Sequence, residues 1–170
     1  MQPIQFVNMT KQYNFKSIDM ARSMLINLNQ EDIVISLSAP SKIPVEWLDQ
    51  VKAKVNIHCG KLPKYAGMMP IFWQINDGLD EISITIHGLA KEIDTGKVFL
   101  ETKIKLSHSL FETSRLAKRE SAHLLKKFLL DVESNIENTI ERKFLSDDVI
   151  LRKFPNKKEV KEFKKIHRLV

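Results

Sequence analysis

The stretch from Glu81 to Leu106 constrains the fold more than any other part of this chain, because it predicts two strands joined by a turn. Side chains alternate between the two faces of a strand. One face of each expected strand is mainly apolar, with Ile82, Ile84, Ile86, Gly88 and Ala90 in the first and Val98, Leu100, Ile104 and Leu106 in the second. We therefore predict an antiparallel hairpin at the centre of a sheet.

The turn Ile93–Lys97 sets the expected pairing of these two strands. A three-residue loop closed by Gly96 in the left-handed region would pair Ile86 with Ile104. The two apolar faces then coincide, whereas a slip by one residue would turn one of them to solvent. We expect the opposite face to be wet, because it carries Ser83, Thr85, His87, Glu101, Lys103 and Lys105.

The segments before the hairpin predict further strands and helices. We expect strands at Ile4–Val7, Ile33–Leu37 and Ile71–Ile75, since these runs are short, apolar and rich in β-branched or aromatic residues. A first helix is expected from Ser17 to about Asn29. A second is expected from Pro44 to Gly60, because Trp47, Leu48, Val51 and Val55 recur at helical spacing.

After the hairpin the sequence becomes helical in character. Ser109 followed by Glu112 has the form of a capping box. Apolar residues then advance by threes and fours without proline or glycine, which predicts a long amphipathic helix near 109–145, either continuous or broken once. A continuous helix would be about 50 Å long, so part of it is expected to project or to pack on another chain. Asn156 with Glu159 predicts the start of a last short helix.

These elements indicate an α+β fold. We predict a mostly antiparallel sheet of about five strands, with one face covered by helices that include the long helix and a short basic C-terminal helix. A chain of 170 residues can bury a substantial core. Residues 1–150 are expected to form a single α+β domain, and residues 151–170 a basic helical tail.

The net charge of +6 is concentrated at the C-terminus. Residues 151–170 carry eight basic and two acidic side chains, which leaves 19 of each sign in the rest of the chain. We predict that the basic side chains contact nucleic acid or another acidic surface. The alternative is a solvated helix face that only keeps the chain soluble. The predicted binding residues are Arg152, Lys153, Lys157, Lys158, Lys161, Lys164, Lys165 and Arg168.

The histidines and the single cysteine do not form a familiar catalytic or metal-binding motif. His58 and Cys59 are adjacent, and we expect a histidine at a helix end followed by a buried free thiol. His87 lies opposite Lys103 in the expected register, and Glu101 is the nearest carboxylate that could orient it as a base. Met68, Met69 and Trp73 are expected in the core, and the alternative is that they line a ligand pocket. We predict no metal, no cofactor and no catalytic residue.

Three functions follow from these observations. The first is a non-catalytic binding protein that uses its basic C-terminal helix on nucleic acid. The second is a structural subunit of a larger assembly, which uses the long helix and the tail as interfaces, including for self-association. The third is an enzyme of unrecognised type, which a pocket with convergent polar groups near His87 or His58 would favour. With one cysteine and neither a secretory signal nor an apolar run of about 20 residues, we expect a cytoplasmic location and no membrane insertion.

Overall fold

The structure is a computed structural model that describes residues 28–37, 42–139 and 149–167. Within these ranges four strands form one mixed sheet in the order β1-β2-β3-β4. The strands are β1 (Ile33–Ser36), β2 (Ala53–His58), β3 (Glu81–Gly88) and β4 (Val98–Lys105). β1 and β2 are parallel, while the other two pairs are antiparallel. The α+β class broadly fits, but the predicted five-stranded, mostly antiparallel sheet is wrong.

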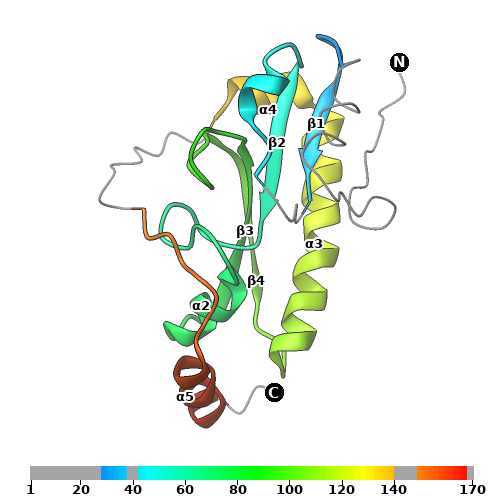
Figure 1. Ribbon diagram of the computed structural model, residues 1–170. Coiled ribbons are helices and arrows are strands. Elements are labelled where there is room, and N and C mark those ends of the chain that lie inside the picture. The colour runs from blue at the N-terminus through cyan, green and yellow to red at the C-terminus, as the bar shows by residue number, and fades with distance from the viewer. Residues whose placement is uncertain (1–27, 38–41, 140–148, 168–170) are drawn as a thin grey trace.

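Helices and a C-terminal segment lie on the two sides of this sheet (Figure 1). The helical elements are η1 (Val45–Leu48, a 3-10 helix), α2 (Pro70–Asn76), α3 (Leu110–Leu130), α4 (Val132–Glu137) and α5 (Lys157–His167). α3 runs along β3 and β4 and buries Ala117, Leu124 and Phe128 in the core that also holds the β3 isoleucines. The segment that leads to α5 lies on the other side of the sheet (Figure 1).

The predicted hairpin is present, but its register differs. Ile86 pairs with Leu100 instead of Ile104, and residues 89–97 form a longer connection than the three-residue loop. The register moves by an even number of residues, so Ile84 (0% exposed) and Ile104 (9% exposed) stay buried. An irregularity at Phe99 places Val98 opposite His87, which turns Val98 to the other face of the sheet.

The face that was expected to be wet is buried at its centre. Ser83, Thr85 and His87 are all less than 5% exposed. The segment after β2 and helix α2 cover them: Thr85 Oγ1 donates to the carbonyl of Gly60 at 2.8 Å, and the Ser83 amide donates to Oε1 of Gln74 at 3.0 Å. The Thr85 hydroxyl and the Ser83 backbone amide are therefore enclosed here with hydrogen-bond partners.

Two predicted elements are of the wrong type. The helix expected from Pro44 to Gly60 is the short η1 followed by strand β2, which lies between β1 and β3 and gains a partner on each side. The strand expected at Ile71–Ile75 is helix α2, with Pro70 at its first turn. Short apolar runs fit both the helical and the strand periodicity, and tertiary contacts decide between the two structures. The expected strand at Ile4–Val7 and most of the helix beginning at Ser17 lie outside the described residues.

The capping prediction for α3 is confirmed, since the Ser109 hydroxyl accepts a hydrogen bond from the Glu112 amide at 3.1 Å. The long helix does not continue unbroken, because Asp131 leaves the helical conformation with φ −146° and ψ 64°. The side-chain Nδ2 group of Asn135 then donates to the carbonyl of Phe128 at 3.1 Å. Residues 140–148 of the expected helix lie outside the described part of the chain.

Helix α5 packs against the body of the protein through one aromatic side chain. Its predicted start is confirmed, because Asn156 Oδ1 accepts from the Glu159 amide at 2.9 Å and Glu159 accepts in return. Phe163 is 3% exposed and stacks on Phe72 of α2 with ring centroids 4.5 Å apart.

We predict that Phe163→Ala lowers the free energy of unfolding by about 3–5 kcal/mol, because it removes a buried aromatic ring from the core. Ile166→Ala is the matched control on the same helix, since Ile166 is 70% exposed. Urea denaturation monitored by circular dichroism measures both variants. Equal effects of the two substitutions would contradict the packing of α5 described above.

Candidate functional site

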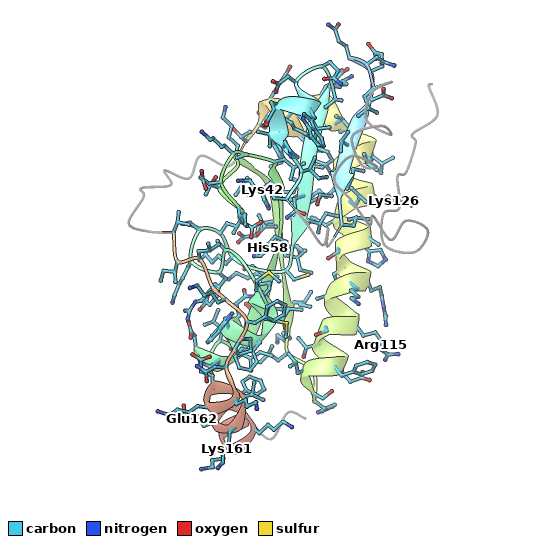
Figure 2. The ribbon with its side chains drawn as sticks, in the orientation of Figure 1. Lys42, His58, Arg115, Lys126, Lys161 and Glu162 are labelled. Carbon is cyan, nitrogen blue, oxygen red and sulfur yellow. The ribbon has the colours of Figure 1, made fainter. Side chains whose placement is uncertain are left out.

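Four polar side chains meet on the sheet face that is turned away from α3. Asn56 and His58 lie on β2, and His87 lies opposite Asn56 on β3. Residues two apart on a strand share a face, and directly paired residues do too. Asp94 joins them from the 89–97 connection. Figure 2 shows His58 near the middle of the molecule, far from Lys161 and Glu162 on α5.

The 89–97 connection folds back onto the end of β3 and so carries Asp94 over the sheet. The Gly88 amide donates to the Lys97 carbonyl at 2.8 Å. Asp94 has a left-handed backbone with φ 56°, which aspartate tolerates better than most residues. A Cβ atom on Gly96 would overlap the carbonyl of Gly88, so only glycine fits this close approach.

The Asp94 carboxylate is the centre of the cluster, and its side chain is 9% exposed. One oxygen, Oδ2, accepts from the Gly67 amide at 2.8 Å and lies 3.5 Å from His58 Nδ1. The other, Oδ1, lies 3.3 Å from His87 Nε2. Burial disfavours the charged form of Asp94. The contacts with His87, His58 and the Gly67 amide outweigh burial and hold its pKa below the usual range.

His58 is a buried, neutral imidazole that faces this carboxylate. Its Nε2 lies 2.6 Å from the carbonyl of Tyr65, which can only accept, so Nε2 carries the proton. Nδ1 is then the unprotonated nitrogen and is directed at Asp94. Burial lowers the pKa of His58, although Asp94 and the Tyr65 carbonyl act in the opposite direction. The arrangement can take up one proton at Nδ1 and place the new positive charge beside a carboxylate.

His87 orients the amide of Asn56. His87 Nδ1 lies 2.9 Å from the carbonyl of Gly88, and Nε2 lies between Asn56 Nδ2 at 3.1 Å and Asp94 Oδ1 at 3.3 Å. The Asn56 Nδ2 group also lies 3.4 Å from Asp94 Oδ1. Glu101, the orienting partner expected for His87, is paired with Thr85 in the sheet register instead.

A cavity of about 470 Å³ reaches the loop that holds Asp94. Thr95 and Gly96, the two residues after Asp94, are in its wall. The remaining wall combines apolar residues with charged ones, including Leu48, Val51, Leu89, Phe99, Ile136, Asp49, Lys52, Lys54 and Lys97. Lys54 pairs with Asp49 and Lys52 with Glu133, each at 2.7 Å. This lining suits a mainly apolar organic ligand with an anionic group near Lys97. Among the described residues no group of three or more histidine, cysteine or acidic side chains is arranged to hold a metal ion.

The predicted basic binding residues do not approach this cluster as a group. Arg152 and Lys153 lie in the segment before α5, and Arg152 forms an ion pair with Asp77 at 2.7 Å. Lys157, Lys158, Lys161, Lys164 and Lys165 are exposed on α5. Arg168 lies outside the described residues. A role for the exposed lysines at an acidic surface stays a prediction. In the described part of the chain no helix has the length and apolar character of a membrane span.

Sequence reasoning missed Asn56 and Asp94 as site residues and gave His58 and His87 too little weight. The spacing Asn56-x-His58 is a signal for Asn56 and His58, because it places two polar side chains on one face of a strand, but the apolar pattern of this segment predicts a helix. The local sequence around Asp94 predicts only a turn. Its contact with His58 needs the long 89–97 connection, which no local pattern predicts.

Comparison with known proteins places this cluster within a recognised family. The family model described as "Formyl transferase" matches residues 3–132, which include all four polar residues of the cluster. The methionyl-tRNA formyltransferase of Ligilactobacillus salivarius is 26% identical over 114 residues, covering 64% of this chain and 35% of that protein. The Ehrlichia canis methionyl-tRNA formyltransferase is 28% identical over 131 residues, covering 76% and 42% respectively. The chain therefore spans well under half the length of these relatives.

Solved structures share the fold. An N-formyltransferase from Helicobacter canadensis, in complex with folinic acid and dTDP-3-aminofucose, aligns with a TM-score of 0.64 and 22% identity over 78% of this chain and 49% of that one. A 4-N formyltransferase from Francisella tularensis aligns with a TM-score of 0.61 and 20% identity over 86% and 64%. At this identity the likeness concerns the fold alone.

The match overturns the first function expected from the sequence. A non-catalytic protein that binds nucleic acid through its basic helix is wrong, and so is the role of an assembly subunit, because the matched family consists of group-transferring enzymes. The basic helix lies beyond the matched residues. The charge pattern at the C-terminus was the most visible feature of the sequence, but it is not where the family resemblance lies.

We predict that Gly96→Ala lowers the free energy of unfolding by about 1–3 kcal/mol, because the methyl group forces the Asp94 loop away from β3. Gly88→Ala is the control, since a Cβ there meets the Phe99 ring at an ordinary 3.6 Å. Thermal unfolding of both variants measures the difference. Similar stability of the two would show that the loop does not need the close approach at Gly96.

Proposed function

Because this chain belongs to the formyl transferase family, we propose that it carries the catalytic site for moving a formyl group from a donor nitrogen to an amine. The observation that supports this most strongly is the buried pair of neutral His58 and ionised Asp94, with the Asn56 amide beside it. Such a pair supplies a base and a counter-charge, and the amide supplies a hydrogen-bond donor.

In the proposed reaction the acceptor amine attacks the carbon of the formyl group. A new carbon–nitrogen bond forms, and the electron pair of the carbonyl moves onto its oxygen, where negative charge develops. One hydrogen of the Asn56 Nδ2 group stays on the His87 ring at 3.1 Å, and the other, which lies 3.4 Å from Asp94 Oδ1 in the free site, turns to that oxygen. His58 Nδ1 takes the proton that the amine loses, and the adjacent Asp94 carboxylate stabilises the resulting imidazolium.

The second half of the reaction restores the site. When the carbonyl forms again, the bond between the formyl carbon and the donor nitrogen breaks. The proton held on His58 passes to the departing donor nitrogen, so the imidazole returns to its neutral form and no net proton is consumed. The low pKa of Asp94 keeps its carboxylate charged throughout, so that it does not compete with His58 for the proton.

We propose a formylated folate as the donor and a primary amine as the acceptor. The Helicobacter canadensis structure contains folinic acid and an amino sugar nucleotide, and the curated relatives act on methionyl-tRNA by name. The cavity that Thr95 and Gly96 help to line supports this proposal, since its apolar side chains suit a flat ring system and Lys97 suits a carboxylate group. Either class of amine remains open as the acceptor.

We predict that Asp94→Asn lowers kcat by about 100-fold or more, because His58 loses its counter-charge when it takes the proton. The assay supplies a formyltetrahydrofolate donor with methionyl-tRNA or an amino sugar nucleotide, and mass spectrometry detects the formylated product. Asp80→Asn is the control, since Asp80 is exposed at the start of β3. A wild-type chain that formylates neither acceptor, or an Asp94→Asn variant as active as Asp80→Asn, would refute this function.

We predict that kcat/KM rises with pH and reaches its plateau after a midpoint below 6.5, the ordinary pKa of histidine. The reason is that the neutral form of His58 is the active form, and burial lowers its pKa. In Asp94→Asn the loss of the negative charge removes a contribution that raises this pKa, so the midpoint moves further down. A pH profile with a midpoint above 6.5 would contradict the assignment of His58 as the base.

A cytoplasmic location is part of the same proposal. Cys59, the single cysteine of the chain, is a free thiol, as is usual in a reducing compartment. Fractionation of cells that produce the tagged chain tests this, and recovery outside the cytoplasm would count against it.

A further inference from the structure

The segment of residues 149–156, here called the C-terminal strap, lies against the loop of residues 61–69 that follows β2. The strap is outside the part of the chain that resembles the formyl transferase family, residues 3–132. Two backbone hydrogen bonds join the strap and the loop: the Arg152 amide donates to the Ala66 carbonyl at 2.8 Å, and the Met68 amide donates to the Arg152 carbonyl at 2.8 Å. Residue 152 therefore forms a short bridge with Gly67.

The same loop holds the two members of the catalytic pair. The Tyr65 carbonyl accepts from His58 at 2.6 Å, and the Gly67 amide donates to Asp94 at 2.8 Å. The bonds to the strap are made by Ala66 and Met68, the residues that alternate with these two. The backbone groups on one edge of the loop thus bond to the site, and those on the other edge bond to the strap, as in a strand with a partner on each side.

Gly67 shows how closely the strap approaches. Its φ of +93° lies in the region that other residues avoid, and a Cβ atom on it would overlap the carbonyl of Arg152. The amide that reaches Asp94 belongs to this residue. A displacement of the strap would therefore free the very backbone that carries the hydrogen bond to the carboxylate.

The Arg152 side chain fixes the strap in place. Its guanidinium forms an ion pair with Asp77 at 2.7 Å, with both side chains only about one-fifth exposed. It also lies over the Trp73 ring at 5.0 Å and the Tyr65 ring at 5.7 Å. The Trp73 indole in turn donates to the carbonyl of Lys153 at 2.9 Å. These contacts clamp the strap between α2 and the loop.

We propose that Arg152 is a positioning residue for formyl transfer, because it holds the strap that fixes the Tyr65 and Gly67 backbone groups against His58 and Asp94. The inference rests on the proposed function for its catalytic consequence. The geometry itself can be tested without any turnover. Arg152 does not touch the reacting groups, and its effect passes through the 61–69 loop.

The direct test is a nuclear magnetic resonance titration of His58 in the full chain labelled with ¹⁵N-histidine. The groups that face His58 are Asp94, His87 and the Tyr65 carbonyl. In Arg152→Gln the loop loosens and water reaches the imidazole. Burial is the largest effect on the His58 pKa, so its relief outweighs the weaker contact with the Tyr65 carbonyl, and the midpoint of His58 rises toward the ordinary value of 6.5. Lys165→Gln is the matched control, since it removes the same charge from the exposed side of α5, and it leaves the midpoint unchanged.

In Arg152→Lys the His58 midpoint is expected to lie between those of the wild type and Arg152→Gln. A lysine keeps the charge opposite Asp77 but loses the planar contact with the two rings. An Arg152→Gln chain that folds and titrates at His58 like Lys165→Gln overturns the proposal. If Arg152→Gln does not fold, Asp77→Asn decides in its place. That variant weakens the clamp with little change in shape, and an unchanged His58 midpoint in it also overturns the proposal.

An activity measurement separates this inference from the function on which it rests. In Arg152→Gln we expect kcat to fall by up to about 100-fold, because small displacements of catalytic groups are costly, while KM for the formyl donor changes little. A wild-type chain without formyl transfer, together with a shifted His58 midpoint in the variant, refutes the function and supports the positioning role. Full activity and an unshifted midpoint in the variant refute the positioning role alone.

Discussion

A buried carboxylate with too few partners would be protonated or would unfold its surroundings, and this constraint on Asp94 organises the centre of the structure. Its two oxygens meet two histidine rings, one backbone amide and the Asn56 amide group within 3.5 Å. Asn56 and His58 come from β2, His87 from β3 and the Gly67 amide from the 61–69 loop. The carboxylate therefore links β2, β3, the 61–69 loop and the 89–97 connection in one hydrogen-bonded cluster.

The sheet makes this cluster possible through register. Pairing of Asn56 with His87 places an amide and an imidazole side by side on the face opposite α3, while Ile84 and Ile86 turn to the helix. The irregularity at Phe99 shifts the register so that Val98 pairs with His87, and the Gly88 amide bonds to the Lys97 carbonyl where residues 89–97 fold back. Hydrophobic packing on one side of β3 and polar chemistry on the other thus follow from the alternation of a single strand.

Local signals in the sequence predicted the local features well. The hairpin strands, the caps at Ser109 and Asn156, and strand β1 were all predicted from periodicity and capping chemistry. Strand β2 was missed because Trp47, Leu48, Val51 and Val55 also fit a helical stripe, and only its two neighbouring strands decide its conformation. The site depends on that same strand, since Asn56 and His58 share a face only in the extended form. The contact of Asp94 with both histidines is long-range, and the patterns of a single sequence do not predict it.

The central claim is that a charged Asp94 and a neutral His58 coexist in one buried pair. Titration of the full chain by nuclear magnetic resonance, with ¹³C in the aspartate carboxyl groups and ¹⁵N in the imidazoles, tests it most directly. We expect the Asp94 carboxyl to titrate below its ordinary value of 3.8 and His58 to titrate below 6.5. An Asp94 that takes up its proton above 3.8, or a His58 that is still charged well above 6.5, would contradict the account.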